Sequence, residues 1–162
     1  MAKNDSLLIR IQRLEAIEAI KVVIAAYGRG ADAGNDVDMM MPLFAQNVVW
    51  DGGERFGRYE GSAAVRDFLL GSHTFIGWTM HYMISPVVEV SQDAQTAIAS
   101  WYLWELAEMP NPDSGQPEAN WIGAVYETQL QKEGDRWKFS LLTFNVRLLS
   151  RYSEGWSRIP LR

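Results

Sequence analysis

The chain has 162 residues, the size of one ordinary domain, and it contains no cysteine, which excludes disulfide bridges, thiolate zinc sites and a thiol nucleophile. Its formal net charge of -5 at pH 7 argues against a nucleic-acid partner, which would require a basic stripe. Charged residues interrupt every turn of the first twenty residues, so neither a signal peptide nor a membrane span is expected there. We therefore expect a single domain over residues 1–162, in the cytoplasm, without a membrane or nucleic-acid partner.

The first part of the chain has the pattern of three helices. Apolar residues recur at intervals of three and four from Leu7 to Ala31, which predicts a long amphipathic helix. Asp36 is suited to cap a second, short helix over residues 37–45, and Ser62 is suited to begin a third. Two short strands are expected between the second and third helices, within residues 47–53 and 55–61.

From residue 78 the apolar period changes from 3.6 to 2, which is typical of strands. Four strands are predicted, over residues 78–90, 95–107, 119–132 and 135–149. Short turns join the first strand to the second and the third strand to the fourth, which predicts two antiparallel hairpins. Residues 108–118, rich in proline and polar residues, are expected to form a long loop. Helices followed by a run of strands predict an α+β domain in which the helices cover one face of a curved sheet.

Large apolar residues occupy both faces of these strands. Trp101 and Leu103 would lie on one face of the sheet, and Tyr102 and Trp104 on the other. An antiparallel sheet with one face in water normally alternates apolar with polar residues. We therefore expect another copy of the chain to cover the second face, and predict a homo-oligomer.

Several ionisable side chains interrupt the apolar faces. His81, Glu105 and Arg147 each lie on a different predicted strand. Each has an explanation without function. A lone histidine on an apolar strand is usually a core residue, and Glu105 and Arg147 could form a structural ion pair. Tyr27 on an apolar helix face is more often part of the core, and Asp32 could belong to a turn.

The combination of these residue types favours chemistry. A carboxylate that binds one imidazole nitrogen leaves the other as a general base. A tyrosine hydroxyl can stabilise a carbonyl oxygen as it becomes an enolate. No cysteine and no Gly-x-Ser-x-Gly motif supplies a nucleophile, so proton abstraction is indicated, and hence elimination or isomerisation. Over five residues of an ideal helix, the direction of the side chain rotates by about 140°. Tyr27 and Asp32 can therefore share a cavity only if the cavity wraps the helix end, or if Gly28 and Gly30 loosen the last turns.

The order of these motifs resembles a known family. A helix ending in Tyr-x4-Asp, a strand with His, the strand WYLWE and a closing strand with Val-Arg are similar to the SnoaL-like branch of the nuclear transport factor 2-like superfamily. The likeness covers residues 17–152 and is strongest to the bile acid 7α-dehydratases, with scytalone dehydratase and lindane dehydrochlorinase more distant. It implies a cone-like barrel of a strongly curved, mostly antiparallel sheet packed against three N-terminal helices. It also implies an oligomer, with a trimer favoured over a dimer.

The resemblance implies an active site made of Tyr27, Asp32, His81 and Arg147, with Glu105 where the family dehydratase has aspartate. His81, oriented by Asp32, would remove a proton next to a carbonyl group, and Tyr27 would stabilise the oxyanion before a hydroxyl leaves as water. Arg147 and Glu105 would orient the substrate or hold the pair. The two histidines lack the spacing of a metal site, so no metal or organic cofactor is expected.

The expected substrate is a small apolar molecule with a ring system, such as a steroid, a terpenoid or a polyketide. Its binding residues are expected to be Trp101, Trp121, Trp78, Met80 or Met83, Phe56 and Asn145. The loop 108–118 and the tail 150–162 could close the mouth of the pocket. Two alternatives remain open at this point: an isomerase of the ketosteroid isomerase type, and a binder of lipophilic ligands without enzymatic activity.

Overall fold

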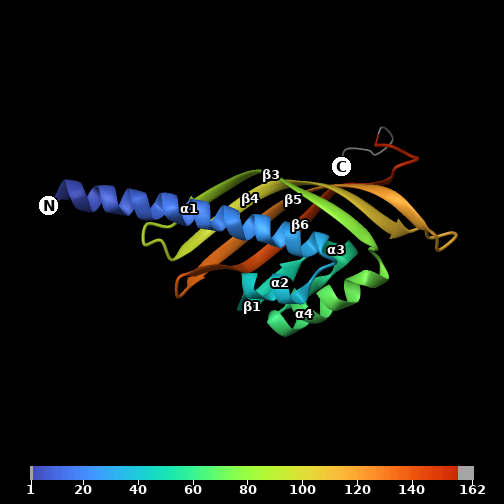
Figure 1. Cartoon of the computed structure of the whole chain (residues 1–162), viewed down its shortest axis with the longest axis horizontal. Helices are drawn as coiled ribbons and strands as arrows, with labels where there is room; N and C mark the ends of the chain where they lie inside the picture. Colours follow the sequence, from blue (N-terminus) through green and yellow to red (C-terminus); the bar gives the residue numbers. More distant parts are fainter. Residues whose placement is uncertain (1, 157–162) are drawn as a thin grey trace.

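The computed structural model describes residues 2–156, in which helices and one sheet are arranged as in Figure 1. The helices are α1 (Ala2–Asp32), α2 (Val37–Met40), α3 (Gly53–Phe56) and α4 (Ser62–Gly71), with the 3-10 turns η1 (Met41–Leu43) and η2 (Ser72–Thr74). The strands are β1 (Phe44–Asp51), β2 (Arg58–Glu60), β3 (Trp78–Val90), β4 (Thr96–Pro110), β5 (Pro117–Glu133) and β6 (Arg136–Arg151). The last six residues of the expected tail, 157–162, lie outside the described residues.

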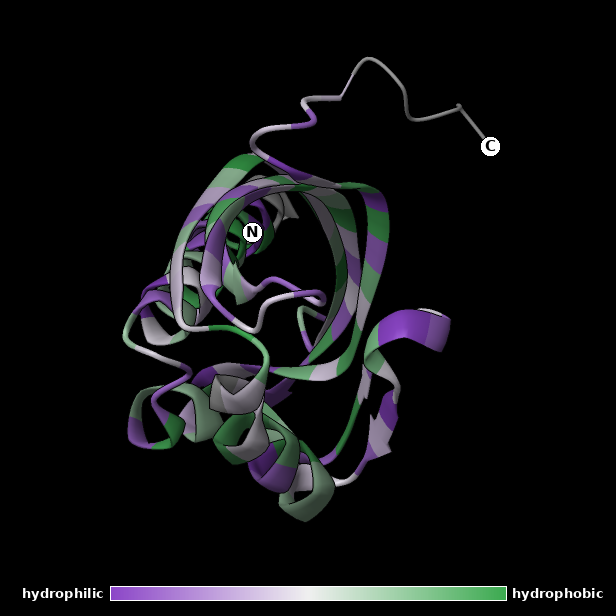
Figure 2. Cartoon of the chain, turned by 90° about the vertical axis from the view of Figure 1, so that its right-hand side faces the viewer, coloured by the Kyte–Doolittle hydropathy of each residue, from purple (hydrophilic) through white to green (hydrophobic). Residues whose placement is uncertain are grey.

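The six strands form one sheet in the order β2-β1-β6-β5-β4-β3. Strands β3 to β6 are antiparallel neighbours, β1 runs parallel to β6, and β2 is an antiparallel edge. Viewed from its end, the sheet curls into an arch (Figure 2). The predicted α+β class and mostly antiparallel curved sheet are confirmed. The three expected helices are α1, α2 and α4, and α3 is an additional single turn.

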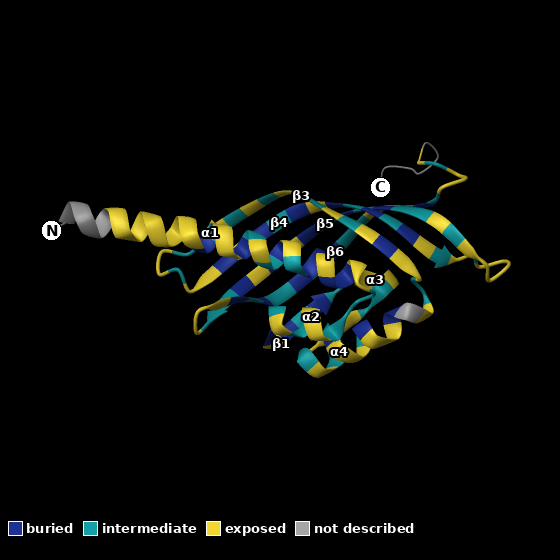
Figure 3. Cartoon of the chain, viewed as in Figure 1, coloured by how far each residue is buried: buried dark blue, intermediate teal, exposed yellow. Residues whose placement is uncertain are grey.

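The concave face of the sheet forms the core together with α1 (Figure 3). Along β4, alternate residues are buried, from Ala97 through Trp101 and Leu103 to Ala107. The residues between them point to the outer face, where Ile98 and Tyr102 are more than half exposed. The period-2 pattern therefore separates an inner from an outer face, as antiparallel strands require.

Residues 108–118 do not form the predicted long loop. Strands β4 and β5 continue to the pair Pro110 and Pro117, so only residues 111–116 connect them. The Asn111 side chain accepts hydrogen bonds from the backbone N–H groups of Asp113 and Ser114, at 2.8 and 3.0 Å, which fixes the turn. Pro110 and Pro117 end the ladder, where a missing N–H is tolerated, and Pro112 lies in the connecting turn.

The end of α1 is held close to its neighbours by two glycines. A Cβ atom on Gly28 would lie 3.1 Å from Met83 Cε, and one on Gly30 would lie 2.5 Å from Met40 Cγ. The helix continues as an α-helix to Asp32, so the glycines do not loosen its last turns. They instead allow α1 to pack against β3 and α2.

The first turns of α1 extend beyond the sheet (Figures 1 and 3). Leu7, Ile11 and Leu14 belong to the predicted apolar stripe, yet they are between 41% and 63% exposed. No other segment within the described part of the chain therefore packs against this end of the apolar stripe. Between residues 2 and 156, no helix combines the length and the apolar content needed to cross a membrane.

Candidate active site

A small, mostly apolar cavity lies between the end of α1, strand β1, helix α4 and the concave face of the sheet. Its volume is about 60 Å³. Its polar lining comes from Tyr27, Asn35, Ser72, Thr79, His81, Glu105 and Tyr126, and its apolar lining includes Trp50, Phe56, Phe68, Phe75, Ile76, Ile122 and Phe144. The cavity wraps the C-terminal end of α1, which explains how Tyr27 reaches it while Asp32 binds one of its walls.

Asp32 and His81 form a direct contact between α1 and β3. Oδ1 of Asp32 lies 2.7 Å from Nδ1 of the imidazole and also accepts a hydrogen bond from the His81 backbone N–H at 2.8 Å. Because β3 is an edge strand, that N–H has no strand partner and is available to the carboxylate. With Nδ1–H donating to the carboxylate, Nε2 is the ring nitrogen that carries the lone pair.

Glu105 lies opposite His81 on the neighbouring strand. The two residues are register partners, and the His81 N–H points to Asp32 and away from β4, so they form a pair without ladder hydrogen bonds. Side chains approach each other most closely in such pairs. Oε2 of Glu105 accordingly lies 3.5 Å from Nε2 of His81, longer than a charge-assisted hydrogen bond.

The carboxyl group of Glu105 is enclosed in the core, with the residue 2% exposed. Its Oε1 atom has no hydrogen-bond partner within residues 2–156. The pKa of Glu105 is raised from the ordinary 4.5 to about 7: burial is the main cause, the nearby His81 opposes the rise, and Asp32 adds to it. Near neutral pH the group is therefore divided between the acid and the carboxylate.

Tyr27 supplies a buried hydroxyl on another wall of the cavity. The residue is 4% exposed, and its oxygen accepts a hydrogen bond from Nε1 of Trp50 at 3.1 Å. That bond leaves the Tyr27 O–H itself available as a donor. Burial raises the pKa of Tyr27, and hydrogen bonds from Trp50 and Tyr126 oppose the rise. The hydroxyl therefore stays protonated and able to donate over the neutral range.

Tyr126 is a second buried hydroxyl that sequence reasoning missed. Burial raises its pKa well above 10, and the neighbouring Tyr27 and Glu105 add to the rise. Its ring is stacked between Trp101 and Phe144, with ring centroids 5.0 and 4.9 Å away. Trp101 therefore packs behind the cavity wall. It was expected to line the cavity, and the structure does not place it there.

Phe56 is the one member of the predicted substrate wall that lines the cavity. Trp78 and Trp121 lie on the outer face of the sheet, where both line a separate apolar groove. The Met83 sulfur accepts a hydrogen bond from Nε1 of Trp101 at 3.1 Å, which places Met83 between α1 and the sheet. Asn145 binds Glu127 on the outer face. The structure therefore does not bring these four side chains to the cavity that Phe56 lines.

Arg147 is also absent from the cavity lining. It lies where the pairing of β5 with β6 shifts, because Gly123 pairs with Leu148 while Ala124 pairs with Val146. The extra residue in this β-bulge is Arg147, and its side chain is exposed. The resemblance implied Arg147 as a site residue, but Arg147 follows Asn145 on the outward-facing side of β6, and its side chain does not line this cavity.

The missed wall residues come from three separate segments of the chain. Trp50 lies near the end of β1, Phe68 lies on α4 and Phe75 follows η2, and the ring centroids of Trp50 and Phe68 are 4.4 Å apart. No sequence spacing links the three segments, so their meeting in one wall could not be predicted.

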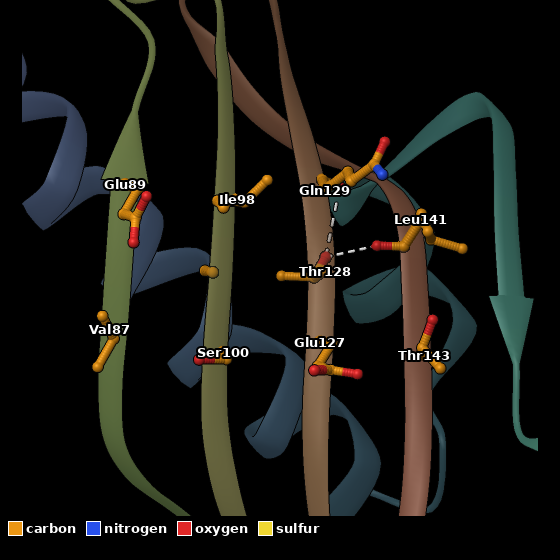
Figure 4. A pocket seen from close by; sticks show the side chains of 10 residues that line it. Val87, Glu89, Ile98, Ser100, Glu127, Thr128, Gln129, Leu141 and Thr143 are labelled. Atoms are coloured by element: carbon orange, nitrogen blue, oxygen red, sulfur yellow. Dashed lines mark hydrogen bonds between the residues drawn. The ribbon is translucent and has the colours of Figure 1, made fainter.

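A larger hollow of about 400 Å³ lies on the outer face of the sheet (Figure 4). It is open, and its ionisable side chains are Glu89 and Glu127, with no base beside them. Inside, Thr128 donates a hydrogen bond to the Leu141 carbonyl, which satisfies it. The smaller inner cavity has the base, the carboxylates and the hydroxyls, and we regard it as the candidate site. Among residues 2–156 no cluster of three or more His, Cys, Asp or Glu side chains suited to a metal was found.

Comparisons with known proteins agree with this architecture. The SnoaL-like domain family matches residues 12–143. A hexachlorocyclohexane dehydrochlorinase, LinA type 2, superposes with a TM-score of 0.79 at 20% identity, over 93% of this chain and 98% of that one. A Novosphingobium aromaticivorans protein assigned as a scytalone dehydratase gives 0.76 at 18% identity, over 88% and 91% of the two chains.

Another protein of that organism, assigned as an aromatic ring hydroxylase, gives a TM-score of 0.74 at 21% identity, over 87% of this chain and 96% of that one. No curated protein matches the sequence. At these identities the likeness to solved structures establishes the fold, and the chemistry has to be argued from the site.

Proposed function

We propose, since the chain belongs to the SnoaL-like domain family, that it is a lyase that eliminates water from a hydroxylated carbonyl compound without a metal or organic cofactor. The observation that carries this proposal is the Asp32–His81 contact at 2.7 Å beside a buried cavity. The likeness to a dehydrochlorinase and to a protein assigned as a dehydratase supports an elimination, because both named activities remove a small molecule from a substrate.

In the proposed reaction, Asp32 accepts a hydrogen bond from Nδ1–H of His81 and so directs the Nε2 lone pair toward the cavity. Nε2 removes a proton from the carbon next to the carbonyl group. The Tyr27 O–H donates to the carbonyl oxygen as negative charge develops on it, and Trp50 fixes the position of that hydroxyl. The hydroxyl group β or vinylogous to the carbonyl then leaves as water.

The aromatic lining of the cavity favours a ring system as the substrate. Aromatic rings form much of its wall, but its volume of about 60 Å³ is well below the roughly 300 Å³ of typical ligand sites. A steroid or other ring system therefore requires the wall to move. Phe56 lies on α3, between Gly53 and Gly57, both at positive φ, which are suited to act as hinges.

The test is a screen of purified protein against hydroxylated cyclic ketones, with detection of products by mass. We expect a loss of one water from at least one member, and no such product with His81→Ala. A product of unchanged mass with a shifted double bond would favour the isomerase alternative. Saturable binding without turnover, equal in His81→Ala, would favour the non-enzymatic binder.

We also propose that copies of the chain associate through the outer face of the sheet, with a trimer favoured over a dimer. Seven large side chains on this face are between 39% and 62% exposed: Trp78, Met80, Tyr82, Ile84, Val87, Ile98 and Tyr102. Together they expose on the order of 700 Å², close to the roughly 800 Å² that each partner buries in a standard interface. Cytoplasmic location remains a prediction from composition.

A further inference from the structure

We propose that Glu105 is the general acid of the reaction, donating the proton that converts the departing hydroxyl into water. This inference rests on the proposed elimination and assigns a role that the base and the oxyanion donor leave open. Hydroxide is a poor leaving group, so an acid at the departing oxygen accounts for the second half of the reaction.

The position of Glu105 fits this role. The carboxyl group lines the same cavity as His81 and Tyr27, so all three groups can reach one bound molecule. Its Oε1 atom is enclosed and has no hydrogen-bond partner in the described part of the chain. A buried polar atom without a partner is costly, and a substrate hydroxyl is the partner that it lacks.

The groups around Glu105 favour its protonated form. His81, Tyr27 and Tyr126 line the cavity with it, and Asp32 lies behind His81. His81 is the one group of this set able to carry positive charge, and its Nδ1–H is already bound to the Asp32 carboxylate. The effect of burial on the Glu105 carboxyl therefore dominates, and its pKa of about 7 lets it act as an acid at neutral pH.

The proton balance closes within the site. Nε2 of His81 takes the carbon-bound proton, the C–O bond breaks, and the Glu105 carboxyl gives its proton to the departing oxygen, forming water. The site then holds an imidazolium and a carboxylate whose Nε2 and Oε2 atoms are 3.5 Å apart. Return of the proton from Nε2 to Oε2 restores both groups without an external acid or base.

The kinetic test compares two leaving groups on one ring. 3-Hydroxycyclohexanone must lose water, whereas 3-acetoxycyclohexanone loses acetate, which needs no protonation, and both yield the same enone. We expect Glu105→Gln to lower kcat on the hydroxy ketone by at least about a hundredfold and to leave elimination of acetate nearly unchanged. Equal losses on both compounds would overturn the proposal, because they would indicate a structural role. Retention of both reactions would overturn it as well.

Two variants separate this inference from the proposed function. His81→Ala should lose both reactions; if it keeps them while Glu105→Gln loses the dehydration alone, the base assignment fails and the acid assignment stands. Glu105→Asp should recover part of the dehydration, since it retains an acid.

The protonation of Glu105 can also be measured without a substrate, so the proposal can be tested even if the protein turns over neither ketone. Infrared difference spectra of wild type and Glu105→Gln should contain the carbonyl band of a protonated carboxyl at pH 6. A carboxylate band in its place at pH 6 would contradict the proposal whatever the substrate.

Discussion

The carboxylate of Asp32 binds the backbone and the imidazole of His81 at the same time. One side chain at the end of α1 thus provides a hydrogen-bond partner for a backbone N–H on the edge of β3 and fixes the tautomer of the imidazole. The backbone contact holds the strand in place and the ring contact orients the base, so the position of the base depends on the packing of α1 against the sheet.

We expect His81→Ala and Asp32→Ala each to lower kcat by at least about a hundredfold, the usual scale for a general base. The histidine variant removes the base, and the aspartate variant releases the ring from its orientation. Steady-state kinetics on a compound identified by the screen provide the measurement. Asp67→Ala, on the exposed face of α4, is the matched control and should keep wild-type turnover. Wild-type kcat in either site variant would refute the assignment.

Tyr27→Phe should lower kcat by about a hundredfold to a thousandfold, the scale for removing one oxyanion donor. The phenyl ring retains the edge contacts with Phe44 and Phe139, at 6.1 and 5.8 Å, so the fold should be preserved. Kinetics combined with a thermal melt separate the two effects. Tyr102→Phe, on the outer face, is the control for loss of a hydroxyl. An active Tyr27→Phe enzyme would show that another group stabilises the oxyanion.

The pKa of Glu105 predicts a pH dependence of stability. Between the unfolded value of 4.5 and the folded value of about 7, the folded protein holds a proton that the unfolded chain has released. Rising pH therefore favours unfolding in this window, by about 3 kcal/mol in total. Urea titrations at pH 4.5 and pH 8 should show that loss in wild type and a smaller one in Glu105→Gln. Identical pH profiles of the two proteins would contradict the raised pKa.

Much of the fold follows from the sequence, and the exceptions have physical causes. Strand β3 has its predicted bounds because turn residues flank it, although its pairing with β4 shifts between Ile84 and Val87. The first turns of α1 have the apolar spacing of a core helix but no sheet beneath them. Periodicity identifies an apolar face without indicating whether the same chain covers it, and this limit also applies to the aromatic residues of the sheet.

The site was predictable where one face of an element is clearly inward, and unpredictable where both faces of a strand are apolar. Tyr27, His81 and Glu105 lie on inward faces that the spacing indicates, and the structure brings them to one cavity. Arg147 was assigned by resemblance, and it follows Asn145 on the outer side of β6, where its side chain is exposed. Trp121 was misplaced because both faces of its strand are apolar, so no pattern distinguishes the inner from the outer face.

The outer face gives a prediction about assembly. Tyr102→Glu should shift the proposed oligomer toward monomers, because it places a charge in the centre of the apolar patch of a chain whose net charge is already -5. Sedimentation velocity measures the change. Leu70→Glu on α4, where the native leucine is 46% exposed outside the patch, should leave the assembly unchanged. Equal masses for wild type and Tyr102→Glu would exclude this face as the interface.

The aromatic wall should control the size of the accepted ring. Phe75→Ala removes a ring whose centroid lies 6.4 Å from both Phe56 and Phe68, and so widens the cavity. We expect kcat/KM for a bicyclic hydroxy ketone to rise relative to a monocyclic one by about tenfold or more. Leu70→Ala, outside the lining, is the control. An unchanged ratio would show that the substrate enters elsewhere.

The most direct measurement of the central proposal is the conversion of hydroxylated cyclic ketones by wild type and His81→Ala in parallel, followed by mass. Proton abstraction by His81 predicts an enone lighter by one water with wild type and at least about a hundredfold less of it with the variant. Equal rates of enone formation by the two proteins would contradict it.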